Sequence, residues 1–175
     1  PYKVLVSTLL SARTRDETTF AVCERLFKKA KTINQLAKLP DSQLAKLIYP
    51  VGFYKTKAIN LSKTAKIIVK EHNGQIPDTF DKLVRLPGIG RKTANLIISR
   101  AYNKPAISVD THVHKISNIL GWVNTKTPEQ TERELAKIIP KKYWREVNRL
   151  LVSLGRQFRS KRKLTEFLRE NELIQ

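Results

Sequence analysis

The turn Pro87-Gly88-Ile89-Gly90, followed by Arg91 and Thr93, has the residue types expected of a site for one phosphate group. Glycines can adopt positive φ and leave neighbouring backbone N–H groups uncovered. These groups would lie at the start of the following helix, where the helix dipole favours anions. Such a turn binds a nucleic-acid backbone phosphate without contacting a base. The alternative is an ordinary helical hairpin with a glycine-rich corner, anchored to the core by the apolar Ile89.

The charge of the chain favours a polyanionic partner. It contains 34 Lys and Arg against 15 Asp and Glu, a formal net charge of +19 over 175 residues. An excess of this size is typical of nucleic-acid-binding proteins, although a solvated basic surface is the alternative. No apolar run approaches the ~20 residues of a transmembrane helix, and the start of the chain does not resemble a signal peptide. We therefore expect no membrane partner.

Cysteine usage limits the metal chemistry. Cys23 is the single cysteine, which excludes a disulfide framework, a Cys-ligated zinc site and an iron–sulfur cluster within one chain. It also indicates an intracellular setting. The three histidines are scattered and no acidic cluster accompanies them, so no transition-metal site is expected.

Helices must position the turn, because helical spacing dominates the hydrophobic pattern and no segment alternates at period two for long. With 41% hydrophobic residues, the chain suits one compact domain or two small lobes. A soft boundary at Asn103-Lys104-Pro105 divides it into residues 1–104 and 105–175. The predicted helices are 4–12 (or a buried strand), 16–30, one after Asp41, 55–72 ended by Gly74, 80–86, 92–101, 113–120, one from Pro128, 143–158 and about 163–171. Asp16 is expected to be the N-cap of 16–30, whose apolar stripe is Phe20, Cys23, Phe27 and Ala30, and the stripe of 55–72 is Ala58, Leu61, Ala65 and Ile68. The stripe Leu164, Phe167 and Leu168 is expected to dock the last helix on the helix around Leu150, Leu151 and Leu154.

Two motifs at a fixed separation carry a family resemblance. The stretch Leu86-Pro87-Gly88-Ile89-Gly90-Arg91-Lys92-Thr93-Ala94 resembles the helix-hairpin-helix of the DNA glycosylase superfamily, and specifically of endonuclease III. Val109-Asp110-Thr111-His112, with Asp110 eighteen residues after Lys92, resembles the family's catalytic aspartate motif. Further matches are Leu9-Leu10-Ser11-Ala12, Gly52-Phe53-Tyr54 with Lys57-Ala58, His72-Asn73-Gly74 and Gly155-Arg156. The resemblance covers nearly the whole chain and implies an all-α, two-lobed fold with a DNA cleft between the lobes.

The same resemblance implies that Lys92 is the nucleophile and Asp110 its catalytic partner. An unprotonated lysine can attack C1′ of the sugar and form an imine. A helix N-terminus, the neighbouring Arg91 and partial burial would favour the neutral amine. Asp110 can stabilise positive charge on the sugar or accept a proton, and we expect the first contribution to be the larger. In the structural alternatives, Lys92 only contacts phosphate and Asp110 only caps the helix 113–120.

The sequence departs from the family at two places. Relatives usually end in four cysteines that hold a [4Fe–4S] cluster, whereas Arg159 stands where the first would be expected, so no cofactor is predicted. Many relatives carry Gln at the position of Arg13, on the loop that fills the gap left by a flipped base. Phe53 matches an apolar wedge on the opposite side, with a core aromatic as the alternative. We assign Arg13, Phe53, Asp16 and His112 to the base gap or lesion pocket, His112 in a supporting role.

These observations predict a monomeric DNA glycosylase with an associated AP lyase activity, which removes oxidised pyrimidines from damaged duplex DNA. One alternative is a monofunctional glycosylase for mispaired uracil or thymine, although relatives of that kind generally lack the lysine. Another is a non-enzymatic helix-hairpin-helix module that binds DNA. We expect the protein to act inside the cell with the chromosomal DNA, in the nucleoid or the nucleus.

Overall fold

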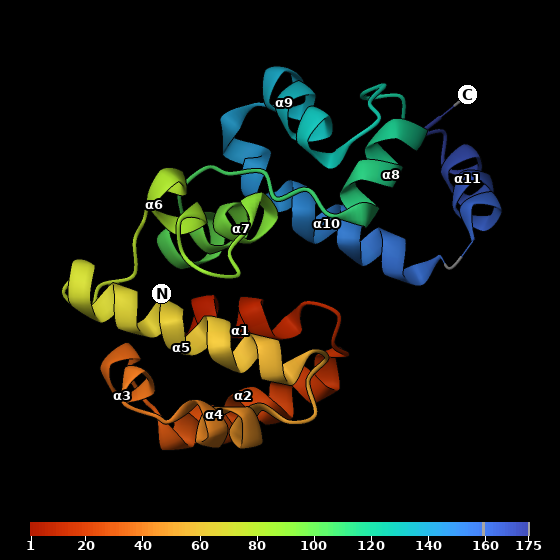
Figure 1. Ribbon diagram of the computed structural model, residues 1–175. Helices are drawn as coiled ribbons and strands as arrows, with labels where there is room; N and C mark the ends of the chain where they lie inside the picture. Colours follow the sequence, from red (N-terminus) through yellow and green to blue (C-terminus); the bar gives the residue numbers. More distant parts are fainter. Residues whose placement is uncertain (159, 175) are drawn as a thin grey trace. The chain divides into compact units, whose positions relative to one another are not determined.

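The computed structural model describes residues 1–158 and 160–174, and within them all regular structure is helical (Figure 1). The all-α class predicted from the hydrophobic spacing is therefore confirmed. The chain divides into two compact units, Pro1–Tyr102 and Asn103–Gln175. The elements are α1 Tyr2–Ser11, α2 Asp16–Lys29, α3 Ile33–Ala37, α4 Asp41–Ile48, α5 Tyr54–Glu71, α6 Phe80–Val84, α7 Arg91–Tyr102, α8 Thr111–Ile119, α9 Pro128–Ile138, the short 3₁₀ helix Lys141–Tyr143, α10 Trp144–Gln157 and α11 Lys161–Glu170.

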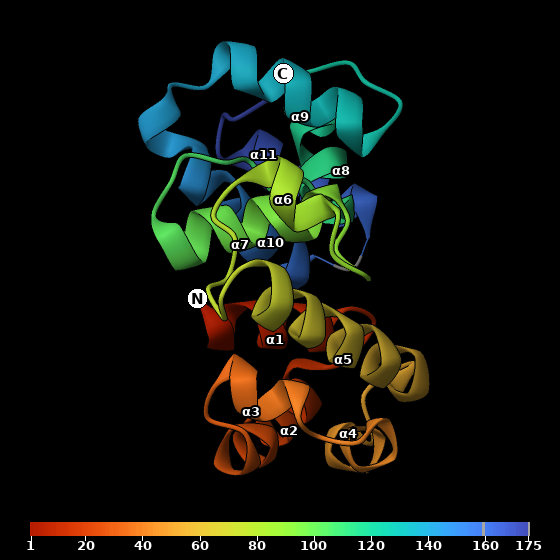
Figure 2. The ribbon, with the colours of Figure 1, turned by 60° about the vertical axis from the view of Figure 1, so that its left-hand side comes forward.

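The N-terminal unit is built around the long helix α5. This helix packs against α3 and α4, and α1 packs against α2, α5 and α7 (Figures 1 and 2). The face of α5 predicted from its spacing is the one that is buried, and the helix ends as expected just before Gly74, whose φ is +73°. Gly74 donates its N–H to the carbonyl of Ile68 at 3.0 Å, which satisfies a carbonyl of the last turn.

Helix α2 differs from its prediction in two respects. It begins at Asp16 with Arg15 as the N-cap, so Asp16 is not the cap but an acidic residue of the first turn, where it still complements the helix dipole. Phe20 is 70% exposed, whereas Val22 and Leu26 are almost completely buried. Cys23 and Ala30 of the predicted stripe are buried and Phe27 is half-buried, so the predicted stripe is wrong at Phe20.

The C-terminal unit has its own hydrophobic core. Helix α8 packs against α9 and α10, and the core is completed by Ile107 and Val109 from the segment that precedes α8 (Figure 2). Helix α9 begins as predicted with Thr127 as the N-cap and Pro128 in the first turn. None of the helices among the described residues is long and apolar enough to cross a membrane.

The predicted C-terminal helix is present as α11 and closes this core. Leu164 and Leu168 are 2% and 0% exposed and belong to the same cluster as Leu151, which confirms the expected docking on α10. Phe167 packs on Phe158 with ring centroids 4.8 Å apart. The contact expected with Leu150 is wrong, because Leu150 lies on the solvent side of α10 and is 55% exposed.

Deleting residues from Leu164 onward is expected to lower the melting temperature clearly. The matched point variants are Leu168→Ala and Leu173→Ala, since Leu173 is 56% exposed and Leu168 is fully buried. Removing a buried leucine side chain costs about 2–5 kcal/mol, so we expect Leu168→Ala alone to lower Tm by about 5 °C or more. Differential scanning calorimetry measures both. Equal melting temperatures for Leu168→Ala and Leu173→Ala would show that α11 does not stabilise the unit.

Candidate functional site

The predicted phosphate turn lies between α6 and α7 in the N-terminal unit. Ile89 is only 5% exposed, which confirms that it anchors the turn to the core. Gly88 has a φ of +78°, a conformation that favours glycine, whereas Gly90 does not have positive φ. The two glycines of the turn are therefore required for different reasons.

Gly90 leaves open space over the backbone at the start of α7. A Cβ atom built on this residue would meet no atom within 4 Å. Neither backbone conformation nor internal packing therefore calls for glycine here. Because Gly90 has no side chain, the backbone next to the first turn of α7 is uncovered. The N–H groups of a first helical turn have no acceptors within the helix and favour an anion.

Helix α5 holds the other side of this turn. The hydroxyl of Thr64 donates to the carbonyl of Pro87 at 3.0 Å, and Thr64 is completely buried. A Cβ atom on Gly88 would lie 3.2 Å from Nδ2 of Asn60. Asn60 and Thr64 were not predicted to belong to the site. Their partners are more than twenty residues away along the chain, and no local motif indicates the contact.

The residues that follow the turn lie at the beginning of α7. The guanidinium of Arg91 lies 4.7 Å from the centre of the Phe80 ring, a cation–π contact that links the starts of α6 and α7. Lys92 is exposed, so the partial burial expected for it is wrong. Thr93 is half-buried in the same turn.

Asp110 is the N-cap of α8 in the C-terminal unit, as its structural interpretation predicted. Its Oδ1 atom accepts hydrogen bonds from the backbone N–H groups of His112 and Val113, each at 2.9 Å. The preceding segment is fixed by the buried side chains Ile107 and Val109 and by a hydrogen bond of 2.9 Å from Nδ2 of Asn148 to the carbonyl of Ser108. The carboxylate of Asp110 is therefore placed by both backbone and core.

His112 packs against helix α10 at a glycine. A Cβ atom on the buried Gly155 would collide with the imidazole of His112, so the absence of a side chain at this position makes room for the ring. This contact brings the motif around Asp110 next to Gly155-Arg156 in the structure. It gives His112 a fixed orientation two residues after Asp110.

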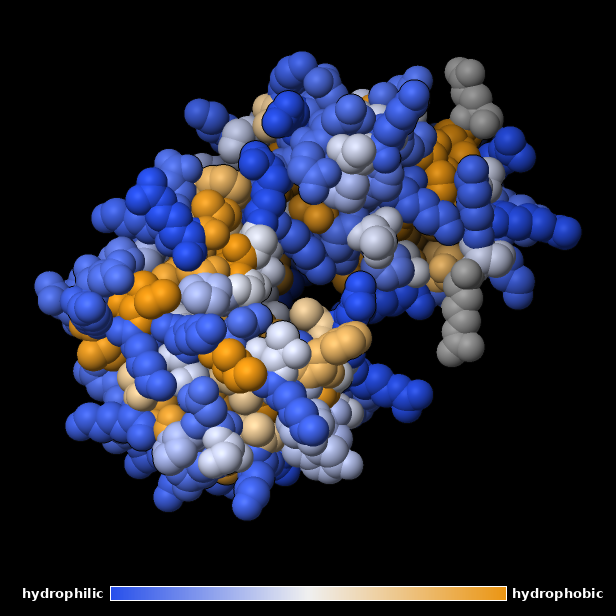
Figure 3. Space-filling view, in the orientation of Figure 1, coloured by the Kyte–Doolittle hydropathy of each residue, from blue (hydrophilic) through white to orange (hydrophobic). Residues whose placement is uncertain are grey.

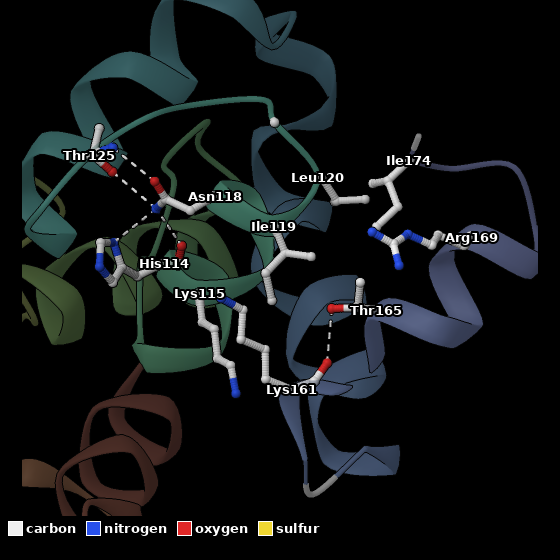
Figure 4. Close-up of a pocket in the computed structure, with 11 residues that line it drawn as sticks. His114, Lys115, Asn118, Ile119, Leu120, Thr125, Lys161, Thr165, Arg169 and Ile174 are labelled. Carbon is white, nitrogen blue, oxygen red and sulfur yellow. Dashed lines mark hydrogen bonds between the residues drawn. The ribbon is translucent and has the colours of Figure 1, made fainter. Parts of the chain in front are cut away.

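His114 has the structural role expected of it. Its Nδ1 atom lies 2.6 Å from Oγ1 of Thr131, and the side chain of Asn118 bridges to the backbone and hydroxyl of Thr125 (Figure 4). His114, Asn118 and Thr125 border an open hollow of about 830 Å³ between α8 and α11. Neither Asp110 nor His112 lines it, so this hollow is separate from the predicted chemistry.

Two of the four residues assigned to the base gap or lesion pocket, Arg13 and Phe53, lie side by side in the N-terminal unit. Arg13 and Phe53 are both exposed, both have positive φ (51° and 57°), and the guanidinium lies 5.5 Å from the ring centre. The core-aromatic alternative for Phe53 is wrong, since the side chain is 64% exposed. In the protein without DNA, the two side chains contact each other. Asp16 is exposed nearby in the chain, at the start of α2.

Basic residues are spread over both units. The N-terminal unit contains 19 Lys and Arg against 7 Asp and Glu, and the C-terminal unit 15 against 8. The face shown in Figure 3 is mostly hydrophilic, with smaller apolar areas between the charged side chains.

Residues 1–158 and 160–174 contain no group of three or more His, Cys, Asp or Glu that could hold a metal ion. The cluster position expected at Arg159 lies outside the described residues.

The structure thus gathers the predicted site residues into three groups. The turn residues and Lys92 form one, Arg13 and Phe53 form the second, and Asp110 and His112 form the third. The first two belong to the N-terminal unit and the third to the C-terminal unit.

Known proteins resemble the chain over most of its length. Residues 6–141 match the family described as HhH-GPD superfamily base excision DNA repair protein. Endonuclease III of Thermotoga maritima is 45% identical over 157 residues, which cover 90% of this chain and 74% of that protein. Endonuclease III-like protein 1 of Gallus gallus is 42% identical over 159 residues, but the match spans only 57% of its length.

Among solved structures, a trapped covalent intermediate of endonuclease III with DNA, in an estranged-adenine complex, matches with a TM-score of 0.85 and 36% identity. The match covers 90% of this chain and 74% of that one. The family pattern, the relatives and the shared fold agree with one another. The chain therefore belongs to the HhH-GPD superfamily of base excision DNA repair proteins, among the homologues of endonuclease III.

Proposed function

We propose that this chain removes a damaged base from duplex DNA and then cleaves the strand at the abasic site, with Lys92 as the nucleophile. It is a DNA glycosylase of the endonuclease III type. The observation that carries the lyase proposal is the place of Lys92: it is exposed and directly follows the phosphate turn at the start of α7. A phosphate on the turn would bring the sugar of a bound nucleotide close to this amine.

The chemistry uses one lysine nitrogen and breaks three bonds of the nucleotide: the glycosidic bond, the C1′–O4′ bond of the sugar ring and the C3′–O bond to the phosphate. The lysine nitrogen forms a bond to C1′ while the glycosidic bond breaks and the base leaves with a proton. The sugar ring then opens to give an imine between Lys92 and C1′. Loss of a proton from C2′ expels the 3′ phosphate by β-elimination, which nicks the strand, and water releases the lysine. That a related endonuclease III was captured as a covalent intermediate with DNA supports this route.

Asp110 supplies negative charge to this reaction. Its Oδ1 atom is committed to two backbone N–H groups, and these bonds hold the carboxylate in one orientation. A fixed carboxylate stabilises positive charge that develops on the sugar as the base leaves. His112, oriented by Gly155, supports the position of this group.

Arg13 and Phe53 are proposed to enter the DNA where the damaged base leaves the stack. Flipping a base costs a few kcal/mol, and side chains that fill the gap and unstack the neighbouring step offset part of this cost. Both residues are exposed and adjacent, as this role requires. Arg13 can donate hydrogen bonds to the orphan base, while Phe53 provides an apolar wedge.

The residues of this sequence do not fit an iron–sulfur cluster. A cubane cluster is held by about four thiolates, whereas Cys23 is the single cysteine and lies buried in α2. We therefore propose a colourless enzyme that works without a cofactor, and no step of the mechanism involves iron. We further propose that it is a monomer that acts on chromosomal DNA and prefers oxidised pyrimidines.

Borohydride trapping on abasic-site DNA tests the proposed function. Reduction converts the imine into a stable amine, so a lyase becomes covalently attached to the DNA. A monofunctional glycosylase would release bases from lesion duplexes but leave no trapped complex. A DNA-binding module would do neither. A panel of duplexes with oxidised pyrimidines or with mispaired uracil and thymine then identifies the preferred base.

Binding to duplex DNA is expected to weaken steeply with salt, because both units carry excess positive charge. If about five phosphates are contacted, log K should fall with log salt with a slope near −4.5. Fluorescence anisotropy with a labelled duplex at several salt concentrations measures this slope. A slope close to zero would contradict phosphate binding as the source of affinity.

A further inference from the structure

Lys57 is a partly buried lysine that holds the loop carrying Arg13. It lies in the first turns of α5, and its Nζ atom donates to the carbonyl of Leu10 at 2.8 Å, to the carbonyl of Ala12 at 2.5 Å and to the hydroxyl of Thr14 at 3.1 Å. An ammonium group has three N–H donors, and here three acceptors from one short segment surround it. The acceptors lie 43 to 47 residues away in sequence, so this is a long-range tie between α5 and residues 10–14.

The hydroxyl of Thr14 extends this tie to the loop that carries Phe53. Besides the bond from Lys57, Oγ1 of Thr14 accepts the backbone N–H of Gly52 at 3.0 Å and donates to the carbonyl of Ala12 at 3.2 Å. Gly52 also approaches the backbone so closely that a Cβ atom on it would collide with the carbonyl oxygen of Arg13. The two loops are thus joined in one network of hydrogen bonds and close contacts.

The conformation of these loops needs such support. Arg13 and Phe53 both occupy the left-handed region, which costs a non-glycine residue free energy unless surrounding structure holds it. Both side chains are exposed, so their packing does not hold the backbone. The contacts of Lys57, Thr14 and Gly52 hold the backbone of the two loops in this conformation.

The ammonium group of Lys57 is partly removed from solvent. Burial lowers the pKa of Lys57 below the ordinary lysine value, while its partners are backbone carbonyls and a hydroxyl rather than a carboxylate. A solvated lysine would avoid this desolvation. The arrangement is therefore consistent with a role that depends on the ammonium group at this place.

We propose that Lys57 is a positioning residue for base flipping: by fixing residues 10–14 against the loop of Phe53, it presents Arg13 and Phe53 together to the DNA. Lys57 does not touch the reacting atoms and acts through these two side chains. The inference rests on the proposed glycosylase function and on the proposed role of Arg13 and Phe53 in the gap. It gives a role to Lys57, which the family match includes without indicating what it does.

The decisive experiment is a double-mutant cycle with Lys57→Gln and Arg13→Ala. Single-turnover base removal is measured on two lesion duplexes, one with a base opposite the lesion and one with an abasic site opposite it. We expect Lys57→Gln to slow the first by about 10- to 100-fold, since a misplacement of about 1 Å can cost up to ~10²-fold. Lys57→Gln and Arg13→Ala should both also abolish the rate difference between the two duplexes. In either variant the orphan base loses its hydrogen bonds from Arg13. The double variant should be little slower than the slower single variant.

A second measurement does not depend on activity. Trypsin cleaves after arginine, and an ordered loop resists it. Lys57→Gln should speed cleavage after Arg13 by about tenfold, which corresponds to about 1.4 kcal/mol of lost local order. Thr14→Val removes the hydroxyl at the centre of the network and should have the same effects, which provides a second route if Lys57→Gln folds poorly. The matched control is Lys63→Gln, an exposed lysine of the same helix that loses the same charge.

The outcomes separate the two proposals. Absence of glycosylase and trapping activity in the wild-type protein would overturn the proposed function. With an active wild type, the inference about Lys57 is overturned if Lys57→Gln keeps the dependence on the opposite base and the wild-type tryptic rate. Additive losses in the double-mutant cycle would also overturn it, because they would show that Lys57 acts independently of Arg13.

Discussion

Lys92→Gln is expected to abolish covalent trapping on abasic-site DNA while DNA affinity stays within a few fold. Glutamine has no nucleophilic amine, so the imine cannot form. It keeps much of the length of the side chain at the exposed start of α7, and the phosphate turn held by Thr64 is untouched. Borohydride trapping followed by gel electrophoresis measures the first quantity, and fluorescence anisotropy the second. This is the largest effect predicted, since one residue supplies the reacting atom.

The control for Lys92→Gln is Lys82→Gln. Lys82 is an exposed lysine of α6 in the same unit, so the loss of charge is matched. We expect this variant to trap at the wild-type rate. If Lys92→Gln still forms a trapped complex at the wild-type rate, a different amine is the nucleophile and the assignment is wrong.

Asp110→Asn is expected to slow base removal by about 10²-fold or more while the melting temperature changes little. The rate falls because a neutral amide cannot stabilise positive charge on the sugar as a carboxylate does. Stability is kept because the side-chain oxygen of asparagine can accept the same hydrogen bonds from His112 and Val113, and asparagine is among the preferred N-cap residues. Single-turnover kinetics and calorimetry measure the two effects separately.

Asp110→Ala separates the two roles of this residue. Alanine loses the cap as well as the charge, so it should lower stability by about 1 kcal/mol in addition to slowing the reaction. A normal rate for Asp110→Asn would leave Asp110 with a structural role only. A large loss of stability in the asparagine variant would show that the measured rate reflects unfolding.

The parts of the site that depend on residues close together in the sequence could be predicted from the sequence. The glycine turn, the buried Ile89 and the N-cap of Asp110 each depend on residues a few positions apart, and each was readable from the sequence. The same holds for most helices, whose stripes or caps lie within one segment. Helix α11 was predicted because Leu164, Phe167 and Leu168 are spaced as one face of a helix, and Leu164 and Leu168 are buried in the structure.

The parts that could not be predicted depend on contacts between distant segments. Lys57 belongs to a family match in the sequence, but only the fold shows that its amine reaches residues 10–14. Thr64 and Asn60 look like ordinary polar residues of the same helix until the turn at Pro87 and Gly88 packs against them. Exposure also depends on the fold, which is why Phe20 was assigned to the core and Lys92 to partial burial.

The two glycines of the phosphate turn are subject to different selective pressures. At Gly88 any side chain would destabilise the folded protein, because φ is positive and Asn60 lies close by. At Gly90 the free protein has room for a side chain and no unusual backbone conformation. A selection for folded, soluble protein would therefore retain glycine at position 88 and allow drift at position 90. Only a selection for survival under DNA damage would retain both, so tolerance at position 90 reports on function alone.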